Sequence, residues 1–327
     1  MIMKGLIFAE GNGYGHASRD MILSEHFGFD IMTYGMGSKY LKMRGKKHIE
    51  IPSPYIIKSE NGTTKITADV KKLLKLIHPN VSNMIIKEFR KVDFIIVDGS
   101  PLGLLLARLA GKKSILITND TGSLVGFSGI EKGIAAKLNE IILTYPEWIF
   151  IPDYKPPLTI TKYNLENIYE NLEIIGPFLE PAKQIKHSKK IIVSTTDEKI
   201  NNELKRELGD NAIYGFEVGN IKPYYQSSDF VISHGGHTSI TEALAYGKPS
   251  VVITDFSYPE RRNHVKVLEE LNIGFGIEKK LFRAEYIWTI IDAVKHLDKG
   301  RLNQYKKEAK NNRPLSAIEN KINDIMK

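Results

Sequence analysis

Continuous apolar runs alternate with helical segments in the first half of the chain. The predicted strands are residues 4–9, 29–34, 94–97 and 114–118, and the predicted helices are 17–26 and 102–110. The strands show no alternation of apolar and polar positions, which is typical of a parallel sheet covered by helices on both faces. The first half therefore predicts an α/β domain.

The same pattern restarts after a stretch rich in proline and glycine at residues 173–181. The predicted strands are then 190–194, 212–216, 230–233 and 251–254, with a predicted helix at 198–208. We expect two domains, residues 1–176 and 177–327, and an amphipathic last helix at 316–326 able to pack back on the first domain. Ligands of such domains bind at the carboxyl ends of the strands, so we expect a site in a cleft between the two.

A glycine turn in the second half carries the strongest chemical signal. The strand at 230–233 leads into Ser-His-Gly-Gly-His-Thr-Ser-Ile-Thr-Glu, residues 233–242, and a helix is predicted to start near Thr238. Backbone N–H groups at a helix N-terminus bind phosphate. The Glu242 carboxylate, one turn further on, can reach ribose hydroxyls. The segment predicts a site for a nucleoside diphosphate.

A second glycine-rich loop, Glu10-Gly-Asn-Gly-Tyr-Gly-His16, follows the first strand. A dinucleotide fingerprint needs glycine where this loop has His16, which disfavours a nicotinamide cofactor. We expect the loop to hold an acceptor substrate, with His16 projecting into the cleft. The alternative is that His16 caps the helix or packs beneath the loop.

Acidic and amide side chains stand at the ends of two further strands of the first half. Asp98 follows the strand at 94–97, where its carboxylate could orient an imidazole. The alternative role for Asp98 is an N-cap of the next helix. Asn119 and Asp120 follow the strand at 114–118 and leave the same two interpretations open.

Composition narrows the classes of function. The chain has 327 residues, 42% hydrophobic and 26% charged, as in ordinary globular proteins, and no cysteine, which excludes disulfides and thiolate chemistry. No signal peptide or apolar run of membrane-spanning length is visible, so we expect a cytoplasmic location. His234 and His237 flank a glycine pair without a third ligand nearby, so no metal site is expected.

The net charge of +8 is concentrated in one segment. Residues 39–93 contain 13 Lys or Arg and 5 Asp or Glu, which accounts for the whole excess. The segment favours a polyanionic partner, either an anionic lipid surface or nucleic acid, or it is simply a solvated lysine-rich face. Apolar residues mixed with lysine at 73–77 and 85–89 favour docking on a membrane, or else form a stripe facing the core.

The segment from Ser233 to Gly274 resembles the nucleotide-sugar-binding motif of glycosyltransferases with the two-Rossmann (GT-B) architecture. The MurG-like enzymes of glycosyltransferase family 28 are the most similar, and plant and macrolide UDP-glycosyltransferases are more distant. Residues 11–16, 95–101 and 176–177 resemble the family's first loop, acceptor-domain core and interdomain linker. The resemblance implies an α/β GT-B fold, in which two Rossmann-like parallel-sheet domains face a central cleft.

The resemblance also implies roles for individual residues. His16 matches the general base and Asp98 the aspartate that supports it, with the acceptor held near Gly13, Gly15, Asn119 and Asp120. The positions matching the donor site are His234, Gly235, Gly236, Thr238 and Ser239 for the diphosphate, Glu242 for the ribose, and Val218 and Ile221 for the base. Family members carry a glutamine that contacts the sugar; here Glu260 is the substitute. The first loop of the second half, residues 194–197, lacks the usual glycines.

The resemblance thus implies an inverting glycosyltransferase that moves a sugar from a UDP-sugar to an acceptor hydroxyl without a cofactor or metal ion. The basic segment suggests a lipid-linked acceptor of the polyprenyl- or dolichyl-phosphate type and a peripheral position on the inner face of the membrane. Two alternatives stay open: a UDP-sugar 2-epimerase of the same architecture, and a non-catalytic binding protein. Nucleic acid is not an expected partner, because no motif with interleaved aromatic residues is present.

Overall fold

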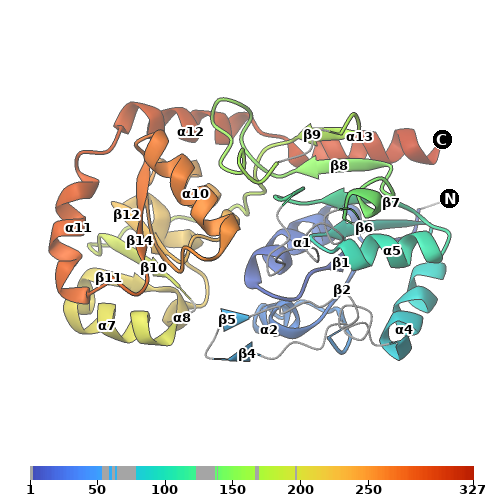
Figure 1. Cartoon of the computed structure of the whole chain (residues 1–327), viewed down its shortest axis with the longest axis horizontal. Coiled ribbons are helices and arrows are strands. Elements are labelled where there is room, and N and C mark those ends of the chain that lie inside the picture. The colour runs from blue at the N-terminus through green and yellow to red at the C-terminus, as the bar shows by residue number, and fades with distance from the viewer. Residues whose placement is uncertain are drawn as a thin grey trace. The chain divides into compact units, whose positions relative to one another are not determined.

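The computed structural model describes residues 3–53, 59–60, 63–64, 79–122, 137, 139–165, 169–195 and 197–327. The chain forms two compact units (Figure 1). The first unit comprises Met1–Pro152, Leu165–Ile175 and Arg313–Lys327, and the second comprises Asp153–Asn164 and Gly176–Asn312. The expected domain boundary between residues 176 and 177 lies one residue from the observed boundary between Ile175 and Gly176. Two further segments belong to the other unit than expected: Asp153–Asn164 to the second unit and Arg313–Lys327 to the first.

The first unit is built on a parallel seven-stranded sheet in the order β3-β2-β1-β6-β7-β8-β9. Its strands are β1 Gly5–Ala9, β2 Asp30–Thr33, β3 Ile49–Glu50, β6 Phe94–Asp98, β7 Lys113–Ile117, β8 Trp148–Ile151 and β9 Leu172–Ile174. A separate antiparallel pair joins β4 Ser59–Glu60 to β5 Thr63–Thr64. The four predicted strands of this half are confirmed within one or two residues at each end.

Five described helices belong to the first unit. They are α1 Tyr14–Phe27, α2 Gly35–Met43, α4 Pro79–Arg90, α5 Pro101–Leu109 and α13 Pro314–Met326. Apolar residues of α4 and α5, among them Ile85, Phe89 and Leu104, join one face of the sheet in a single core. Figure 1 shows α13 beside β8, where the Lys321 ammonium lies 3.4 Å from the centre of the Trp148 ring.

The second unit has a parallel five-stranded sheet in the order β11-β10-β12-β13-β14. Its strands are β10 Ile191–Ser194, β11 Ala212–Tyr214, β12 Phe230–Ser233, β13 Ser250–Thr254 and β14 Gly274–Glu278. The helices are α7 Glu198–Leu208, α8 Gly215–Val218, α9 His237–Ala245, α10 Pro259–Glu270, α11 Ile287–Val294 and α12 Lys299–Asn311, with short 3₁₀ helices η1 Gly209–Asn211, η2 Lys222–Ser227 and η3 Ala284–Tyr286.

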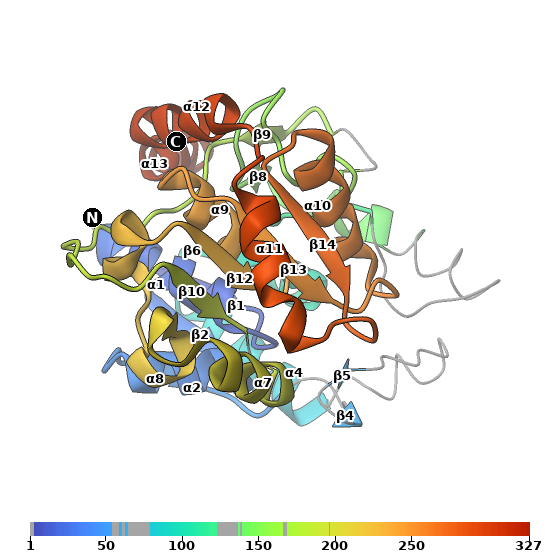
Figure 2. The same ribbon diagram turned by 90° about the vertical axis from the view of Figure 1, so that its left-hand side faces the viewer.

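Alternating residues of these strands face opposite sides of the sheet and contribute to three clusters, one of which holds Ile192 and Val231. Ile191, Val193 and Ile232 pack with α7 and α11 on one face, which is the near side of the sheet in Figure 2. Val252 on the other face packs with α9, α10 and α12, together with apolar residues of the segment Asp153–Asn164. Both faces are therefore buried, which explains why the strands are continuously apolar in sequence.

Each sheet reverses its strand order at one place, and both reversals lie next to the predicted motifs. In the first unit the order runs outward from β1 to β2 and β3 on one side and continues with β6 on the other side, so it reverses between β1 and β6. In the second unit it reverses in the same way between β10 and β12. Open α/β sheets bind ligands outside the carboxyl ends of the strands at such reversals. The loop from Glu10 to His16 and the glycine turn after Ser233 each follow a strand at a reversal.

Candidate functional site

The first cluster of polar side chains lies where β1 and β6 end. Ala9 and Asp98 are paired in register, so the residues that follow these two strands are brought together. Helix α1 begins at Tyr14, with Gly13 as its N-cap, instead of at the predicted Ala17. His16 is therefore a first-turn residue of the helix.

His16 and Asp98 form a direct pair. His16 Nδ1 lies 2.8 Å from Asp98 Oδ1, and the Asp98 side chain is fully buried while 25% of the His16 side chain is exposed. No side chain caps α1, so the alternative that His16 is a helix cap is wrong. Because Nδ1 is occupied by the carboxylate, Nε2 is the ring nitrogen left for a ligand.

Arg19 is a third member of this cluster, and sequence analysis missed it. Its Nε donates to Asp98 Oδ2 at 2.8 Å, its Nη2 donates to Oδ1, and Nη2 lies 3.2 Å from His16 Nδ1. Burial would raise the pKa of Asp98, but Arg19 and then His16 outweigh it and hold that pKa well below its usual range. Asp98 is thus kept as a carboxylate in a dry position. Arg19 is three residues from His16 on one helix face, a spacing that could have revealed it.

Two more buried carboxyl groups surround the pair. Both oxygens of Asp20 are buried without a hydrogen-bond partner among the described residues, and burial raises its pKa well above the usual value. Burial also raises the pKa of Glu10, whose Oε1 accepts hydrogen bonds from the Tyr34 hydroxyl and from Asn12 Nδ2 at 2.7 Å. The cluster therefore combines one firmly ionised carboxylate with two groups shifted toward the neutral acid.

The N-cap interpretation of Asp98 is also wrong. Helix α5 is capped by Ser100, whose side chain accepts a hydrogen bond from the Gly103 amide at 3.3 Å. Between the two, Gly99 has φ +70°, and a Cβ there would lie 2.3 Å from His16 Cε1. The lack of a side chain at Gly99 is what allows the imidazole to reach Asp98.

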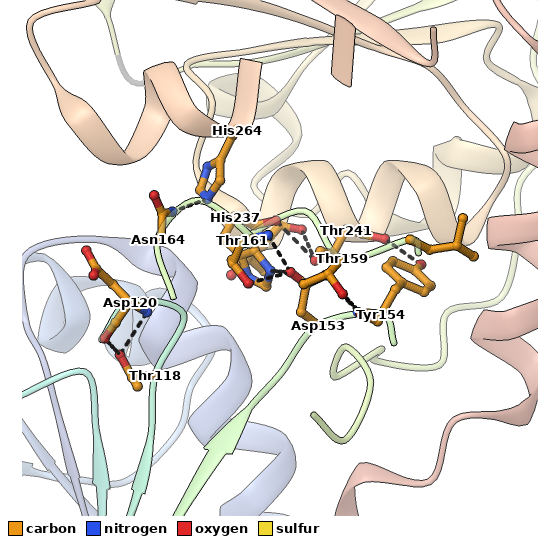
Figure 3. A network of polar contacts seen from close by, with 12 residues as sticks. Thr118, Asp120, Asp153, Tyr154, Thr159, Thr161, Asn164, His237, Thr241 and His264 are labelled. Carbon is orange, nitrogen blue, oxygen red and sulfur yellow. Dashed lines mark hydrogen bonds and ion pairs between the residues drawn. The ribbon is translucent and has the colours of Figure 1, made fainter. Parts of the chain in front are cut away.

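The other predicted acceptor residues have local roles in the structure. Asp120 closes its own turn: its amide and carbonyl both bond the Thr118 hydroxyl, at 3.2 and 2.9 Å, and its carboxylate accepts from the Gly122 amide at 2.9 Å (Figure 3). Asn119 is partly buried beside it. Gly13 is open, with nothing within 4 Å of an added Cβ, and Gly15 lies in the first turn of α1.

The glycine turn of the second unit has the predicted conformation. Gly235 has φ +87° and its amide donates to Ser233 Oγ at 3.2 Å, and Gly236 is the N-cap of α9, which begins at His237. No side chain caps this helix. The first amides of α9, including those of Thr238 and Ser239, are free of intrahelical acceptors, as in helices that bind anions.

His264 fixes the glycine turn through a hydrogen bond to its backbone. His264 Nδ1 donates to the Gly235 carbonyl at 2.9 Å, and Asn164 Nδ2 donates to His264 Nε2 at 3.1 Å. Asn263 Nδ2 in turn donates to Asn164 Oδ1 at 2.8 Å. Burial lowers the pKa of His264, in keeping with a neutral ring that donates on one side and accepts on the other. Sequence analysis gave no sign of this chain of contacts.

A buried Asp–His pair stands at the start of α9 (Figure 3). His237 Nε2 lies 3.4 Å from Asp153 Oδ2, which also accepts from the Thr161 amide and hydroxyl, each at 2.7 Å. Burial would raise the pKa of Asp153, but His237 and the Thr161 hydrogen bonds outweigh it and lower that pKa. Asp153 belongs to the segment that leaves the first unit in sequence and packs in the second.

His234 is neutral at physiological pH. Burial, followed by the nearby Arg261 charge, lowers its pKa to about 4, and its Nδ1 is buried without a hydrogen-bond partner among the described residues. His234 can therefore offer a hydrogen bond to a phosphate but not a positive charge. The cation beside the turn is Arg261, whose Cβ lies 3.4 Å from the position of an added Gly235 Cβ and whose guanidinium lies 4.6 Å from the centre of the Tyr258 ring.

Glu242 is buried and already paired. Its Oε1 lies 3.3 Å from the ammonium of Lys222, which donates to Glu180 Oε2 at 2.7 Å. Val218, at the end of α8, is 38% exposed, and Ile221 packs partly buried beside η2, immediately before Lys222. Glu260 lies in the first turn of α10, next to Arg261.

The described residues contain no group of three or more His, Cys, Asp and Glu side chains placed to hold a metal ion. Of the loop at 194–197, Thr195 Oγ1 accepts from the Asp197 amide at 3.0 Å, and Asp197 caps α7. Thr196 lies outside the described residues. The first amides of α9, His234 and Arg261 therefore lie close together at the glycine turn.

Comparisons with known proteins agree with this arrangement. Residues 174–327 match the model of the glycosyltransferase family 28 C-terminal domain. A relative from Methanosarcina mazei, described as an uncharacterized glycosyltransferase, is 29% identical over 323 residues and covers 83% of this chain and 85% of its own.

Solved structures share the fold over nearly the whole chain. MurG of Acinetobacter baumannii superposes with a TM-score of 0.58 at 13% identity, covering 98% of this chain and 99% of its own. LpCGTa, solved in complex with UDP, has a TM-score of 0.62 at 13% identity and covers 94% of each chain. The protein is a glycosyltransferase of the GT-B architecture. Its second half, residues 174–327, is similar to the glycosyltransferase family 28 C-terminal domain, and its fold is shared with MurG.

Proposed function

We propose that the protein transfers a sugar from a UDP-sugar to an acceptor hydroxyl with inversion at the anomeric carbon. His16 Nε2 takes the proton of the acceptor hydroxyl, the oxygen forms a bond to the anomeric carbon, and the bond from that carbon to the diphosphate breaks. The Asp98 carboxylate accepts a hydrogen bond from His16 Nδ1–H and stabilises the imidazolium that forms. The observation that supports this most is the 2.8 Å contact between His16 and the buried Asp98.

The donor half of the proposal rests on the glycine turn. The uncapped amides of α9, with Thr238 and Ser239, would bind the diphosphate and stabilise the charge that develops when it leaves. Glu242 would accept hydrogen bonds from the ribose hydroxyls, and Val218 and Ile221 would contact the base. UDP in the related LpCGTa structure supports this nucleotide. We propose that no metal ion or other cofactor takes part, since these groups supply the charge stabilisation.

The base assignment is tested with His16→Ala. Removal of a general base lowers kcat by about 10²- to 10⁴-fold, and because the residues proposed to bind UDP all belong to the second unit, the Kd for UDP should stay unchanged. His26→Ala, at the other end of the same helix, is the control and should keep kcat within about twofold. A His16→Ala enzyme with a wild-type rate would show that the base lies elsewhere.

The donor is identified by thermal shift and calorimetry with UDP-, TDP- and GDP-sugars, with and without EDTA. We expect UDP-sugars to raise Tm and EDTA to leave that shift unchanged. No shift with any nucleotide would contradict the donor site. Conversion of a UDP-sugar to its C2 epimer without an acceptor would indicate an epimerase instead.

For the acceptor we propose a hydroxyl of a lipid-linked glycan, of the polyprenyl- or dolichyl-phosphate type, or of another membrane lipid. The basic segment at 39–93 supports it, although Leu73–Ile77 lies outside the described residues, and Ile85 and Phe89 are buried in the core, so these two are not available to lipid. Within the described parts of the chain, no helix is long and apolar enough to span a bilayer. Flotation with vesicles of anionic and of neutral lipid tests the proposal: binding to the anionic vesicles alone is expected, and binding to neither contradicts it.

A further inference from the structure

Lys222 is the only lysine that is buried in the part of the chain the structure describes, with 6% of its surface exposed. Lysine is almost never buried unless it is paired. Its ammonium lies 2.7 Å from Glu180 Oε2 and 3.3 Å from Glu242 Oε1. Glu180 lies between β9 and β10, and Glu242 lies in the second turn of α9, so one ammonium bridges two carboxylates from different elements.

The backbone of Lys222 is fixed as firmly as its side chain. The Lys222 amide donates to Asn220 Oδ1 at 3.1 Å, and Gln184 Nε2 donates to the Lys222 carbonyl at 3.0 Å. These hydrogen bonds fix the position from which the Lys222 side chain reaches Glu242. Lys222 also follows Ile221 directly, so the segment proposed to contact the base is the one that supplies this cation.

The charge balance of this cluster leaves Glu242 sensitive to both neighbours. Burial raises the pKa of Glu242 above its usual range; Lys222 offsets part of that rise, and Glu180 adds to it. The other titratable groups that act on Glu242 are the hydroxyls of Tyr225, Tyr246 and Tyr154, which are neutral at physiological pH because burial raises their pKa values. Lys222 is thus the cation that favours the ionised form.

We propose that Lys222 is a positioning residue for the nucleoside part of the donor: it holds Glu242 as an oriented carboxylate able to accept hydrogen bonds from two vicinal hydroxyls, while Glu180 opposes it. This inference rests on the proposed function, in which Glu242 binds the ribose. An ionised carboxylate offers acceptors only, whereas the protonated acid loses acceptor capacity to its own proton. The Lys222 ammonium contacts Glu242 through Oε1.

The test compares two variants that break the same ion pair from opposite sides, Lys222→Met and Glu180→Gln. Lys222→Met should raise the donor KM at pH 7 by about tenfold or more, the effect of losing a hydrogen bond to a charged group, with kcat little changed. The KM of this variant should recover as the pH rises, because Glu242 then ionises only at higher pH. Glu180→Gln should leave the donor KM unchanged or lower, and Lys222→Arg should restore most of the loss.

A purely structural ion pair gives a different pattern. Both variants would then lower Tm and would shift the KM, if at all, in the same direction at every pH. That result, or an unchanged KM in Lys222→Met, would overturn the inference. A ligand control sharpens the readout: Lys222→Met should weaken the binding of UDP but not that of 2′,3′-dideoxy-UDP, which lacks both hydroxyls.

Two further variants separate this inference from the proposed function and allow for a variant that does not fold. If Glu242→Gln binds UDP as tightly as the wild type, the ribose assignment fails. If Glu242→Gln weakens binding and Lys222→Met does not, only the role of Lys222 fails. The double variant Lys222→Met/Glu242→Gln removes both charged groups of the Lys222–Glu242 pair. Because the lysine is proposed to act only through Glu242, the double variant should bind UDP no more weakly than Glu242→Gln alone.

Discussion

At the residue scale, the two candidate half-sites differ in how they control charge. Around His16, Arg19 keeps Asp98 ionised in a buried position, so the imidazole always has a carboxylate partner. Around the glycine turn, burial keeps His234 neutral, so the positive charge there comes from Arg261 and the partial charges of the backbone N–H groups. The sequence suggested His16, Asp98 and His234, but it does not state their protonation, because that depends on which groups are buried beside them.

Gly99→Ala should damage catalysis more than stability. Both Gly99 and Gly111 have φ near +70°, so alanine at either costs roughly 1–2 kcal/mol in the free energy of unfolding. Only at Gly99 does the added Cβ meet the His16 ring, at 2.3 Å, whereas nothing lies within 4 Å at Gly111. We expect kcat to fall by at least about tenfold in Gly99→Ala and to stay unchanged in Gly111→Ala. Equal activity in the two variants would contradict the role of Gly99.

His234 should make the protein less stable in mild acid. Burial lowers its pKa to about 4 in the folded chain, against 6.5 for an ordinary histidine. Between these two pH values the unfolded chain binds more protons, so the contribution of His234 to stability is complete above pH 6.5 and is lost as the pH falls toward 4. The loss should be no more than about 3 kcal/mol.

The measurement is urea unfolding of the wild type and of His234→Gln at pH 7 and at pH 4.5. The wild type should lose more stability than the variant, because glutamine does not titrate. Parallel pH dependence in the two proteins would show that His234 stays accessible to protons in the folded state.

At the element scale, the apolar pattern predicted which segments form strands and helices, but it did not predict where each element begins and ends. The predicted strands are confirmed, since each is buried on both faces and reads as a continuous apolar run. Helix α1 starts three residues before the predicted position, because Gly13 in an extended conformation serves as the N-cap without a side-chain signal. The early start is what puts His16 and Arg19 on one helix face next to Asp98.

Helix α13 should be a structural part of the first unit. Ile318 and Ile322 are buried, and Lys113 Nζ donates to the Ile325 carbonyl at 2.7 Å. Ile322→Ala should lower the free energy of unfolding by about 2–5 kcal/mol, whereas the exposed Met326→Ala should change it by less than about 0.5 kcal/mol. Trp148 fluorescence in a Trp288→Phe background reports on this unit. Equal midpoints of urea unfolding would show that α13 is dispensable.

At the scale of the whole molecule, the chain passes between its two units more than once. The segment Asp153–Asn164 contributes the buried Tyr154, Leu158 and Ile160 to the core of the second unit, and Tyr305 donates to the Leu158 carbonyl at 2.7 Å. Residues 165–175 and 313–327 belong to the first unit. A boundary drawn in sequence therefore does not separate the folding units.

Fragment stability tests this division. A fragment of residues 153–312 should fold and unfold cooperatively, because it contains the whole second unit. A fragment of residues 177–312 lacks three fully buried side chains, each worth about 1.5–3 kcal/mol, and should not fold stably. The measurement is thermal unfolding followed by circular dichroism, with dispersion of amide resonances as a second readout. Cooperative unfolding of the shorter fragment with the same Tm would contradict the assignment.

The sequence by itself determined the α/β class, most strands and the glycine turn, and its resemblance to GT-B glycosyltransferases implied that Asp98 supports His16. The class, the strands and the turn depend on local pattern, whereas the pairing of β1 with β6, which brings His16 to Asp98, is seen only in the structure. Only the tertiary structure decided that Lys222 pairs with Glu242, that His264 and Asn164 support Gly235, and that Asp153 packs beneath α9. Those contacts join residues 20 to 100 positions apart through packing and register, which no local pattern encodes.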